Sequence, residues 1–463
     1  MKVLLTTPVI RQSYQRIPDI GLGYLATGIR QKGHEALIFQ CEKDKHSIEE
    51  FTSEVVKIKP DVLGIKVFSL DLPSVRKSID AVRKNLPEIK IILGGPHPSC
   101  AEPDELMDYF SEADYAFKGE ADIGFPMLLD LIGGRETEIE EIPGLIYRKN
   151  GSIHSNGPAY ETELDTLGFP SWDLIDPNGY SDRWSFWLKN VPTGIVLYSR
   201  GCPYQCTFCA AQVVSGKKVR KRSIENVLEE MELLYDKYNI RNFDFIDDNF
   251  ITMKKDVLIL CDEIQKRGWK IDWSVGGVRL DALDAETIKS MEKAGCRSIS
   301  VGIESGSERI LKDMKKSLTL DKVSEKLALI KSNSNISVMG QFIIGFPTEK
   351  IEDIKKTISF ACSSNIDYVT FYTFHPLPGS EAYEDLINRG ELSGVDWSSI
   401  TPDTKPYSPP GISSFKLKWL YRYAYIRFYT KPRTLKTIIR ELTDFAHIKK
   451  WLRRAKNKLW SNN

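Results

Sequence analysis

Three cysteines within eight positions are the strongest chemical signal in this 463-residue chain. Cys202, Cys206 and Cys209 follow an apolar run with the spacing Cys-x-x-x-Cys-x-x-Cys. Soft thiolates of this kind bind iron–sulfur clusters or zinc. Structural zinc normally takes four ligands, and no fourth Cys or His lies nearby in the sequence. Three cysteines can instead hold three irons of a 4Fe–4S cluster and leave the fourth iron open, whereas a zinc knuckle or chance clustering is the alternative.

An aromatic residue, Phe208, directly precedes the last of these cysteines. The loop therefore resembles the Cys-x-x-x-Cys-x-aromatic-Cys signature of the radical S-adenosylmethionine (SAM) superfamily. The resemblance implies that Cys202, Cys206 and Cys209 are metal ligands and catalytic residues, that the open iron binds SAM, and that Phe208 contributes to the SAM site. In this family one electron from the cluster cleaves SAM to a 5′-deoxyadenosyl radical.

Polar residues at the ends of later predicted strands agree with that resemblance, in order along the chain. Asp248 stands where the family has a motif that meets the SAM amine. Arg279 could pair with the SAM carboxylate through its guanidinium fork, and Glu304 could accept hydrogen bonds from the ribose hydroxyls. Simpler interpretations exist as well: Asp248 could cap the next turn, and Arg279 could form a surface ion pair with Asp281.

A segment after another predicted strand loosely resembles the family's adenine-binding motif, Gly-x-Ile-x-Gly-x-x-Glu. Aligned on Gly345, it puts Ile343 in the Ile position, while Gly340 and Glu349 each lie one residue too far out. Ile344 and Gly345 are the predicted SAM contacts here, because glycine would let the backbone approach the purine. A plain turn at Gly345 is the alternative.

The first part of the chain resembles the cobalamin-binding domain that is fused to many radical SAM enzymes. The matching runs are 20–26, 33–35, 94–98 and 118–120, whose small residues would let a nucleotide tail enter the edge of a sheet. The predicted cobalamin contacts lie in these runs and in the loop at 68–70: Leu22, Ser69, Gly94, Gly95, His97, Gly119 and Glu120.

The Asp-x-His-x-x-Gly motif, which supplies a histidine ligand to cobalt in methionine-synthase-type domains, is absent from the sequence. Cobalamin is therefore expected to bind base-off and without a histidine ligand. His97 lies between two prolines and is expected to contact the cofactor from its loop rather than to ligate cobalt. His34 follows a glycine that ends a predicted helix and is expected to be structural.

The apolar runs and amphipathic stretches predict an α/β protein with two parallel sheets. Residues 1–135 are typical of a doubly wound, Rossmann-like and flavodoxin-like domain. Residues 136–190 lose this rhythm and form a predicted linker with a hairpin at Asn150-Gly151. Residues 191–385 indicate a partial (β/α)6 TIM-type barrel, and residues 386–463 a basic helical extension. The predicted strands are 2–6, 35–40, 61–67, 89–93, 114–117, 194–199, 242–246, 272–275, 298–303, 337–344 and 368–373.

Charge is distributed unevenly although the whole chain carries only +1. Residues 415–463 hold 14 Lys/Arg against Glu441 and Asp444, a net charge of +12, so residues 1–414 carry −11. We expect no nucleic-acid partner for the acidic body. Peripheral contact with a membrane could pass through the tail, whose cations alternate with aromatic residues. A lid over the barrel, or a helix packed on the acidic body, are the alternatives.

Composition indicates a globular protein, with 41% apolar and 27% charged residues. No apolar run approaches the roughly 18 residues that a membrane span needs. The apolar run at the start of the chain is too short and too polar for a signal peptide. The isolated spacing of the other cysteines argues against a disulfide framework and a second cluster, so we expect a cytoplasmic protein. These cysteines, predicted to be buried small hydrophobes, are Cys41, Cys100, Cys261, Cys296 and Cys362.

The combined resemblance implies a radical SAM enzyme with cobalamin, which in this family most often methylates an unactivated carbon or phosphorus. One SAM would methylate cob(I)alamin, and a second would give the radical that abstracts hydrogen from a small-molecule or lipid substrate. Such an enzyme needs an external one-electron donor of the flavodoxin or ferredoxin type. Two alternatives stay open: a cobalamin-dependent radical cyclase or rearrangement enzyme without methyl transfer, and a non-catalytic cobalamin-binding regulator.

Overall fold

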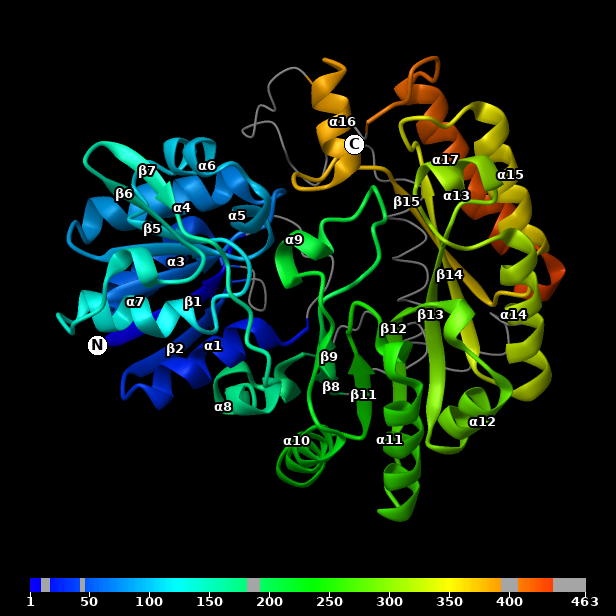
Figure 1. Ribbon diagram of the computed structural model, residues 1–463, viewed down its shortest axis with the longest axis horizontal. Helices are drawn as coiled ribbons and strands as arrows, with labels where there is room; N and C mark the ends of the chain where they lie inside the picture. Colours follow the sequence, from blue (N-terminus) through cyan, green and yellow to red (C-terminus); the bar gives the residue numbers. More distant parts are fainter. Residues whose placement is uncertain (10–16, 42–45, 181–191, 393–406, 436–463) are drawn as a thin grey trace.

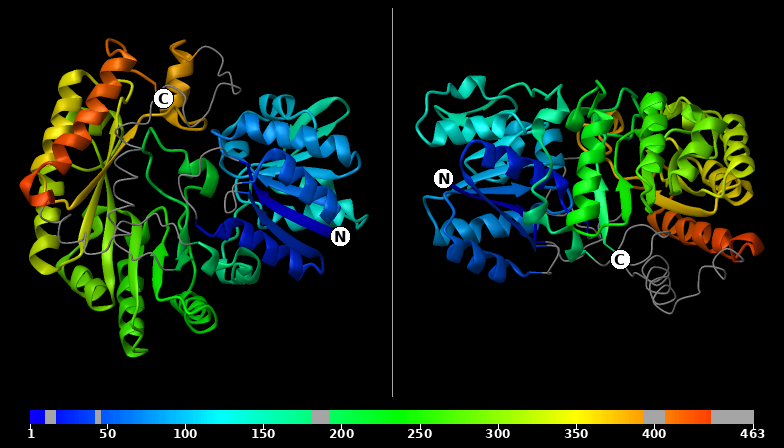
Figure 2. Two further views of the ribbon diagram at one scale, coloured as in Figure 1. Left: turned by 180° about the vertical axis from the view of Figure 1, so that it is seen from behind. Right: turned by 90° about the horizontal axis from the view of Figure 1, so that it is seen from below.

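The computed structural model describes residues 1–9, 17–41, 46–180, 192–392 and 407–435. Figure 1 shows two α/β bodies side by side, a front domain coloured blue to cyan and a partial barrel coloured green to orange. Figure 2 shows the same arrangement from two further directions, with helix α17 (Ser414–Tyr429) on the side of the barrel remote from the front domain.

The front domain is built on a parallel sheet with the strand order β2-β1-β3-β4-β5. This is the flavodoxin-like order, and it places the topological switch point between β1 and β3. Each predicted strand agrees with an observed one to within one residue at either end, so the doubly wound domain is confirmed. The strands are β1 (Lys2–Thr7), β2 (Glu35–Gln40), β3 (Val62–Lys66), β4 (Lys90–Gly94) and β5 (Tyr115–Phe117).

Helices cover both faces of this sheet, since its strands are apolar on both sides. Two separate apolar clusters result, one around Leu63 and Phe51 and the other around Leu5 and Phe125. The helices are α1 (Ile20–Gln31), α3 (Ile48–Ile58), α4 (Leu72–Asn85), α5 (Pro96–Cys100), α6 (Pro103–Tyr109) and α7 (Gly124–Ile132).

The predicted hairpin forms, but it belongs to the front sheet. Strands β6 (Leu145–Lys149) and β7 (Ser152–Ser155) turn at Asn150 and Gly151, both with positive φ (53° and 78°), as a two-residue hairpin turn requires. Strand β6 pairs antiparallel with β5, so the sheet continues past residue 135, where the sequence placed the end of the domain. Strand pairing depends on a partner about 30 residues away, which local patterning does not reveal.

The barrel sheet consists of six described parallel strands in the order β8-β11-β12-β13-β14-β15, and it is open between its two end strands. This confirms the predicted (β/α)6 architecture. The strands are β8 (Thr193–Val196), β11 (Asn242–Phe245), β12 (Asp272–Val278), β13 (Cys296–Glu304), β14 (Ser337–Ile344) and β15 (Tyr368–Thr373). The helices on its outer face are α10 (Ile224–Lys237), α11 (Lys254–Lys266), α12 (Ala285–Lys293), α13 (Glu308–Asp313), α14 (Leu320–Asn333) and α15 (Ile351–Ser363).

The first predicted barrel strand, 194–199, is interrupted. Asp247 accepts hydrogen bonds from the backbone N–H groups of Tyr198 and Ser199, so the chain leaves the sheet after β8. A short strand, β9 (Ser199–Arg200), then pairs antiparallel with β10 (Arg220–Lys221). This ribbon leads directly into the cysteine loop.

The two bodies share buried contacts through the linker. Helix α8 (Trp172–Ile175) packs against α1, and the Trp172 indole donates to Glu230 of α10 at 3.0 Å. Glu230 also pairs with Arg222, whose guanidinium donates to the hydroxyl of Tyr24 on α1 at 3.3 Å. Because a single apolar cluster contains residues of α1, α8 and the barrel, the front domain is anchored on the barrel rather than loosely tethered.

The remaining described elements are two short helices, α9 and α16, and several 3₁₀ turns. Within the described residues no helix is both long and apolar enough to cross a membrane, and the predicted basic helices beyond residue 435 lie outside them. The elements are α9 (Ala211–Ser215), α16 (Glu381–Asn388), and the 3₁₀ turns η1 (Ile139–Glu141), η2 (Leu164–Leu167), η3 (Pro177–Gly179), η4 (Phe250–Met253) and η5 (Leu280–Ala282).

Candidate active site

The cysteine loop runs between β9 and α9 and is fastened by backbone contacts. Gly201 has φ 91°, and a Cβ there would lie 2.4 Å from the carbonyl oxygen of Lys218, so only glycine fits. The Cys202 N–H donates to the Gly216 carbonyl at 3.1 Å. The Gln212 side chain donates to the Cys202 carbonyl at 3.2 Å and to a second loop carbonyl. The loop therefore has a defined shape before any cluster binds.

The three thiols share one environment. Cys202 and Cys206 are half-buried, whereas Cys209 is exposed. Burial raises the pKa of the half-buried Cys202 and Cys206 thiols, and the neighbouring Cys202 thiol adds to the shift at Cys206. Iron binding must therefore displace protons from this loop.

The cysteine loop supplies the kind of donors that a cluster needs. The ligands of a 4Fe–4S cube each bind a different iron, so Cys202, Cys206 and Cys209 would hold three irons and leave the fourth open. Among the described residues, no three His, Cys, Asp or Glu side chains form a site for a single metal ion.

Arg279 lies beside the cysteine loop, at the end of β12. Its guanidinium stacks over the ring of Tyr204 at 3.8 Å and donates to the Ser317 carbonyl at 3.2 Å. It also forms the ion pair with Asp281 that the sequence offered as the simpler interpretation, at 2.8 Å. Because the same guanidinium is close enough to lower the pKa of Cys202 and Cys206, the ion pair and a role near the cluster are compatible.

Glu304 occupies the end of β13 in a left-handed conformation, with φ 68°. Its carboxylate is buried and pairs with Lys316 at 2.9 Å. Lys316 in turn lies near Cys206, and its positive charge partly offsets the rise in pKa that burial causes at this thiol. Lys316 is a site residue that sequence reasoning missed, because a lysine in a Lys-Lys pair gives no local sign of being buried.

Asp248 and its neighbour Asp247 accept hydrogen bonds from different residues. Asp248 accepts a hydrogen bond from the Gly201 N–H, so it contacts the residue that precedes the first cysteine. Asp247 is the buried member of the pair and accepts from the Ser199 hydroxyl at 2.6 Å. Both residues follow the end of β11 (Asn242–Phe245), where Asp247 is buried and Asp248 is exposed, a difference that residue type alone does not predict.

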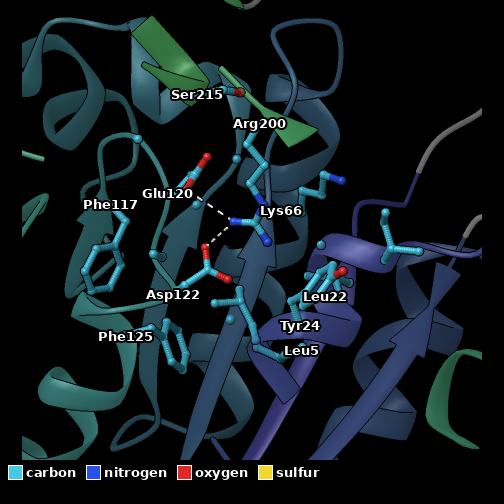
Figure 3. A pocket seen from close by; sticks show the side chains of 18 of the residues that line it. Leu5, Leu22, Tyr24, Lys66, Phe117, Glu120, Asp122, Phe125, Arg200 and Ser215 are labelled. Atoms are coloured by element: carbon cyan, nitrogen blue, oxygen red, sulfur yellow. Dashed lines mark hydrogen bonds and ion pairs between the residues drawn. The ribbon is translucent and has the colours of Figure 1, made fainter. Parts of the chain in front are cut away.

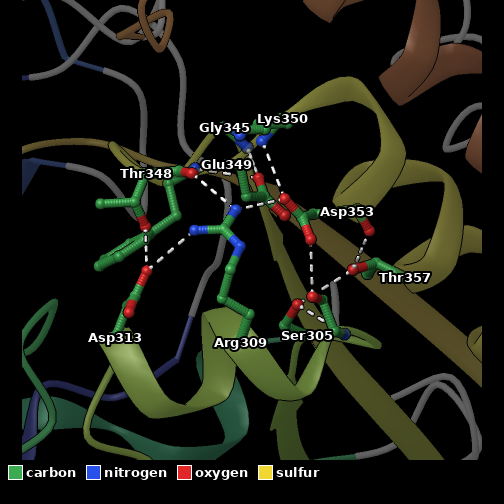
Figure 4. A network of polar contacts seen from close by, with 11 residues as sticks. Ser305, Arg309, Asp313, Gly345, Thr348, Glu349, Lys350, Asp353 and Thr357 are labelled. Carbon is green, nitrogen blue, oxygen red and sulfur yellow. Dashed lines mark hydrogen bonds and ion pairs between the residues drawn. The ribbon is translucent and has the colours of Figure 1, made fainter.

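The turn after β14 is held from below by Glu349. Its Oε2 accepts from the N–H groups of Gly345, at 2.6 Å, and of Phe346, at 3.1 Å. Figure 4 shows this carboxylate at the upper end of a polar network that also contains Arg309 and Asp353. Burial raises the pKa of Glu349 to about 8, so it is protonated at neutral pH. Gly345 itself has φ 92°.

The two isoleucines of this segment point to opposite faces of the sheet. Ile344 is fully buried in the outer core, between the sheet and its helices. Ile343 instead joins an apolar cluster at the strand end that also contains Phe208 and Phe346. Alternate strand residues face opposite sides, so Ile343 is the side chain on the Phe208 side of the sheet, and the choice of Ile344 as a SAM contact stays a prediction.

A cavity of about 330 Å³ opens at the switch point of the front sheet, within the usual range of roughly 300–1,000 Å³ for small-molecule sites. Figure 3 shows Tyr24, Phe125 and Arg200 around it. A Cβ at Gly94 would meet no atom within 4 Å, so this glycine borders open space. The cavity suits part of a cobalamin, such as its nucleotide tail. Predicted contacts on its wall are Leu22, Gly94, Gly95, Gly119 and Glu120.

Ser69 and His97 are absent from the residues that line this cavity. His97 is buried, and its Nδ1 lies 3.0 Å from the Ser69 hydroxyl. Burial lowers the pKa of His97 to about 4, so the imidazole is neutral near pH 7. This hydrogen bond joins α5, which carries His97, to the turn after β3, which carries Ser69.

Arginines join the cavity to the cysteine loop. Arg200 pairs with Glu120 at 3.2 Å and with Asp122 at 2.7 Å, as Figure 3 shows. Arg220, opposite it on the ribbon, binds both oxygens of Glu120 at 2.7 and 2.8 Å. The sequence prediction missed these contacts, although an arginine directly before Gly201 was a signal that could have been examined.

Comparison with known proteins agrees with both halves of this site. Residues 196–361 match the radical SAM superfamily, and residues 6–129 match the B12 binding domain. The chain is 30% identical over 442 residues to a Pyrococcus horikoshii protein named uncharacterized methyltransferase PH0819, with 94% of each chain covered. It is 25% identical to the cytidylyl-2-hydroxyethylphosphonate methyltransferase of Streptomyces wedmorensis, over 84% of this chain and 82% of that protein.

A solved structure shares the fold. The radical SAM methyltransferase TsrM from Kitasatospora setae, with cobalamin and a 4Fe–4S cluster bound, superposes with a TM-score of 0.66 at 18% identity, over 90% of this chain and 81% of that one. The chain therefore belongs to the cobalamin-dependent radical SAM enzymes, whose cofactors are SAM, a 4Fe–4S cluster and cobalamin.

Proposed function

We propose that this enzyme transfers a methyl group to an unactivated carbon, or to phosphorus, of a small-molecule or lipid substrate. The observation that carries the proposal is the direct link between the switch-point cavity and the cysteine loop through Arg200 and Glu120. Bound together, the cluster and SAM supply a 5′-deoxyadenosyl radical, and cobalamin supplies the methyl group. The two similar proteins named as methyltransferases support this reaction class.

The chain's own residues would hold the reactants in line and exclude water. Cys202, Cys206 and Cys209 would each ligate one iron. Arg279 would turn part of its guanidinium from Asp281 towards the SAM carboxylate, a rearrangement that its half-buried position permits. Phe208 and Ile343, which share one apolar cluster, would lie on the same side of the bound SAM.

Three further residues would complete the SAM site. Asp248 would face the SAM amine next to Gly201. Glu304 would accept from the ribose hydroxyls while Lys316 balances its charge. The electron would come from an external donor of the flavodoxin or ferredoxin type, because a 4Fe–4S cluster needs a one-electron reductant.

The test compares Cys206→Ala with Cys362→Ala, a half-buried cysteine on α15 outside the loop. Anaerobically reconstituted enzyme is incubated with SAM, cobalamin and a strong reductant, and its nucleoside products are quantified by chromatography. We expect 5′-deoxyadenosine and cobalamin-dependent S-adenosylhomocysteine from the parent and from Cys362→Ala. Neither product should exceed background in Cys206→Ala.

The pattern of nucleoside products distinguishes methyl transfer from the two alternative functions. Deoxyadenosine without S-adenosylhomocysteine would favour the cyclase or rearrangement chemistry. If an enzyme loaded with both cluster and cobalamin gave neither product, the regulator hypothesis would replace the proposal.

A further inference from the structure

Helix α17 uses one face to cover the open edge of the barrel. Leu417, Leu420 and Phe428 are fully buried on this face. The Tyr425 hydroxyl donates to the Phe371 carbonyl of β15 at 3.1 Å and accepts from the N–H of the same residue at 3.0 Å. The inner face is therefore committed to the fold.

The outer face of α17 carries large apolar side chains that remain in solvent. Phe415 is 82% exposed, Trp419 and Ile426 are each 49% exposed, and Tyr423 is 37% exposed. The spacing of 4, 4 and 3 residues places all four on one stripe of the helix. The Trp419 and Tyr423 rings stack 5.2 Å apart, 7° from parallel. A contiguous apolar stripe of this kind marks an interaction surface rather than a random exposure.

Cations border this stripe. Between Ser414 and Leu435 the chain has six Lys/Arg and no Asp or Glu. Lys416 and Arg427 lie along one side of the stripe at helical spacing, and Lys418 and Arg422 lie along the other. The Lys416 ammonium lies over the Trp419 ring at 5.0 Å. Any partner of this face must therefore offer an apolar layer edged by negative charge.

We propose that the outer face of α17 binds an anionic lipid surface. Aromatic rings sit at the boundary between headgroups and acyl chains, and flanking lysines and arginines reach the lipid phosphates. A second copy of the chain fits less well, because an isologous contact would bring two sets of these cations together. The proposal is independent of the reaction that the enzyme catalyses.

Helix α17 places this surface near the proposed SAM site. Leu417 packs against the turn after β14, since a Cβ at Gly345 would lie 3.0 Å from its Cδ2. The first turn of α17, with Phe415 and Trp419, is thus at the carboxyl-end rim of the barrel, where the proposed SAM residues lie. A membrane bound by this face would lie beside that rim.

The experiment is co-sedimentation of the full-length, cofactor-loaded protein with vesicles. Vesicles of equal parts phosphatidylcholine and phosphatidylglycerol are compared with pure phosphatidylcholine, at low and high salt. The double variant Phe415→Ala/Trp419→Ala removes the N-terminal half of the stripe. The matched control is Ile259→Ala, which trims a side chain on α11 that is 50% exposed. Circular dichroism and the thermal midpoint confirm that each variant is folded.

We expect salt-sensitive binding to the anionic vesicles, weakened about tenfold or more in the double variant because two large apolar groups no longer insert. Ile259→Ala should bind like the parent. Replacing Lys416 and Arg427 by glutamine should weaken binding about fivefold for each cation.

Three results would overturn the proposal. The first is no binding to anionic vesicles at low salt. The second is unchanged binding by the double variant, which would place the contact elsewhere in the chain. The third is a concentration-dependent dimer, formed without vesicles and lost in the double variant, which would make this face a contact between two copies.

Discussion

At the scale of a single residue, the buried carboxyl of Glu349, which bonds to the Gly345 turn, has an energetic cost that cannot be predicted from the sequence. Glu349 is 2% exposed, and its Oε1 has no hydrogen-bond partner among the described residues. Burial without a cation raises its pKa from the usual 4.5 to about 8. Burial therefore keeps the carboxyl neutral, although the two backbone N–H groups that donate to Oε2 favour its ionised form.

This carboxyl makes stability depend on pH. The unfolded chain releases the Glu349 proton near pH 4.5, whereas the folded chain keeps it to about pH 8. Between these values the folded state binds more protons, so the free energy of unfolding falls as pH rises and levels off above about 8. We expect Glu349→Gln, which keeps an acceptor oxygen, to gain stability over the parent progressively through this window.

Thermal midpoints of the parent and Glu349→Gln, recorded across the same window, measure this gain. The matched control is Glu352→Gln, an exposed carboxylate on α15, which should follow the parent at every pH. Parallel pH profiles for the parent and Glu349→Gln would contradict a protonated Glu349.

Among the elements, helix α17 covers the open edge of the barrel sheet. Strand β15 has no neighbouring strand on its outer side among the described residues, and exposed edges invite pairing with other chains. Hydroxyls of Tyr425 and Tyr429 replace that neighbour, with Tyr429 bonded to the Val369 carbonyl at 3.1 Å. The packed-helix alternative drawn from the sequence thus holds for the inner face of α17, while its outer face stays exposed.

Tyr425→Phe should destabilise the protein by about 1–3 kcal/mol, because it leaves the N–H and carbonyl of Phe371 buried without this partner. Chemical denaturation measures the change. Tyr423→Phe, which removes a hydroxyl from an exposed ring on the same helix, should change stability by less than about 0.5 kcal/mol. Equal effects of the two substitutions would show that the hydroxyl bonds do not matter.

Across the whole molecule, buried ions connect the front domain to the ribbon that enters the cysteine loop. The side chains of Glu120, Asp122, Arg200 and Arg220 are each at most 11% exposed. Buried pairs of this kind add little net stability, yet removing one partner leaves a charge without compensation. The network therefore fixes how the cobalamin domain sits against the cluster loop more than it strengthens either body.

Glu120→Gln should accordingly cost about 3–5 kcal/mol and lower the thermal midpoint by several degrees, since buried Arg220 would lose its carboxylate partner and Arg200 would keep only Asp122. Calorimetry measures the shift. Glu54→Gln is the comparison, because its pair with Lys57 is exposed and should contribute about 0–1 kcal/mol. A thermal midpoint for Glu120→Gln within a degree of the parent would argue against this role for the buried ion pairs.

Local signals account for what was predictable. The strands of the front domain were correct to one residue because short apolar runs between amphipathic helices are local patterns. The barrel strands β14 and β15 were placed correctly for the same reason, whereas β8 was extended too far because Asp247, about 50 residues later, ends it. Five of the seven predicted cobalamin contacts line the cavity, whereas Ser69 and His97, which are hydrogen-bonded to each other, are not among its lining residues.

Residue type and spacing along the chain were enough to identify the three-cysteine loop and the two parallel-sheet bodies, because these depend on neighbours in sequence. Pairing between distant residues decided the rest: the Arg200–Glu120 ion pair, the Lys316–Glu304 pair, the opposite faces of Ile343 and Ile344, and the two faces of α17. Such contacts form only when packing brings separate segments together, and a one-dimensional pattern holds no record of which segments will meet.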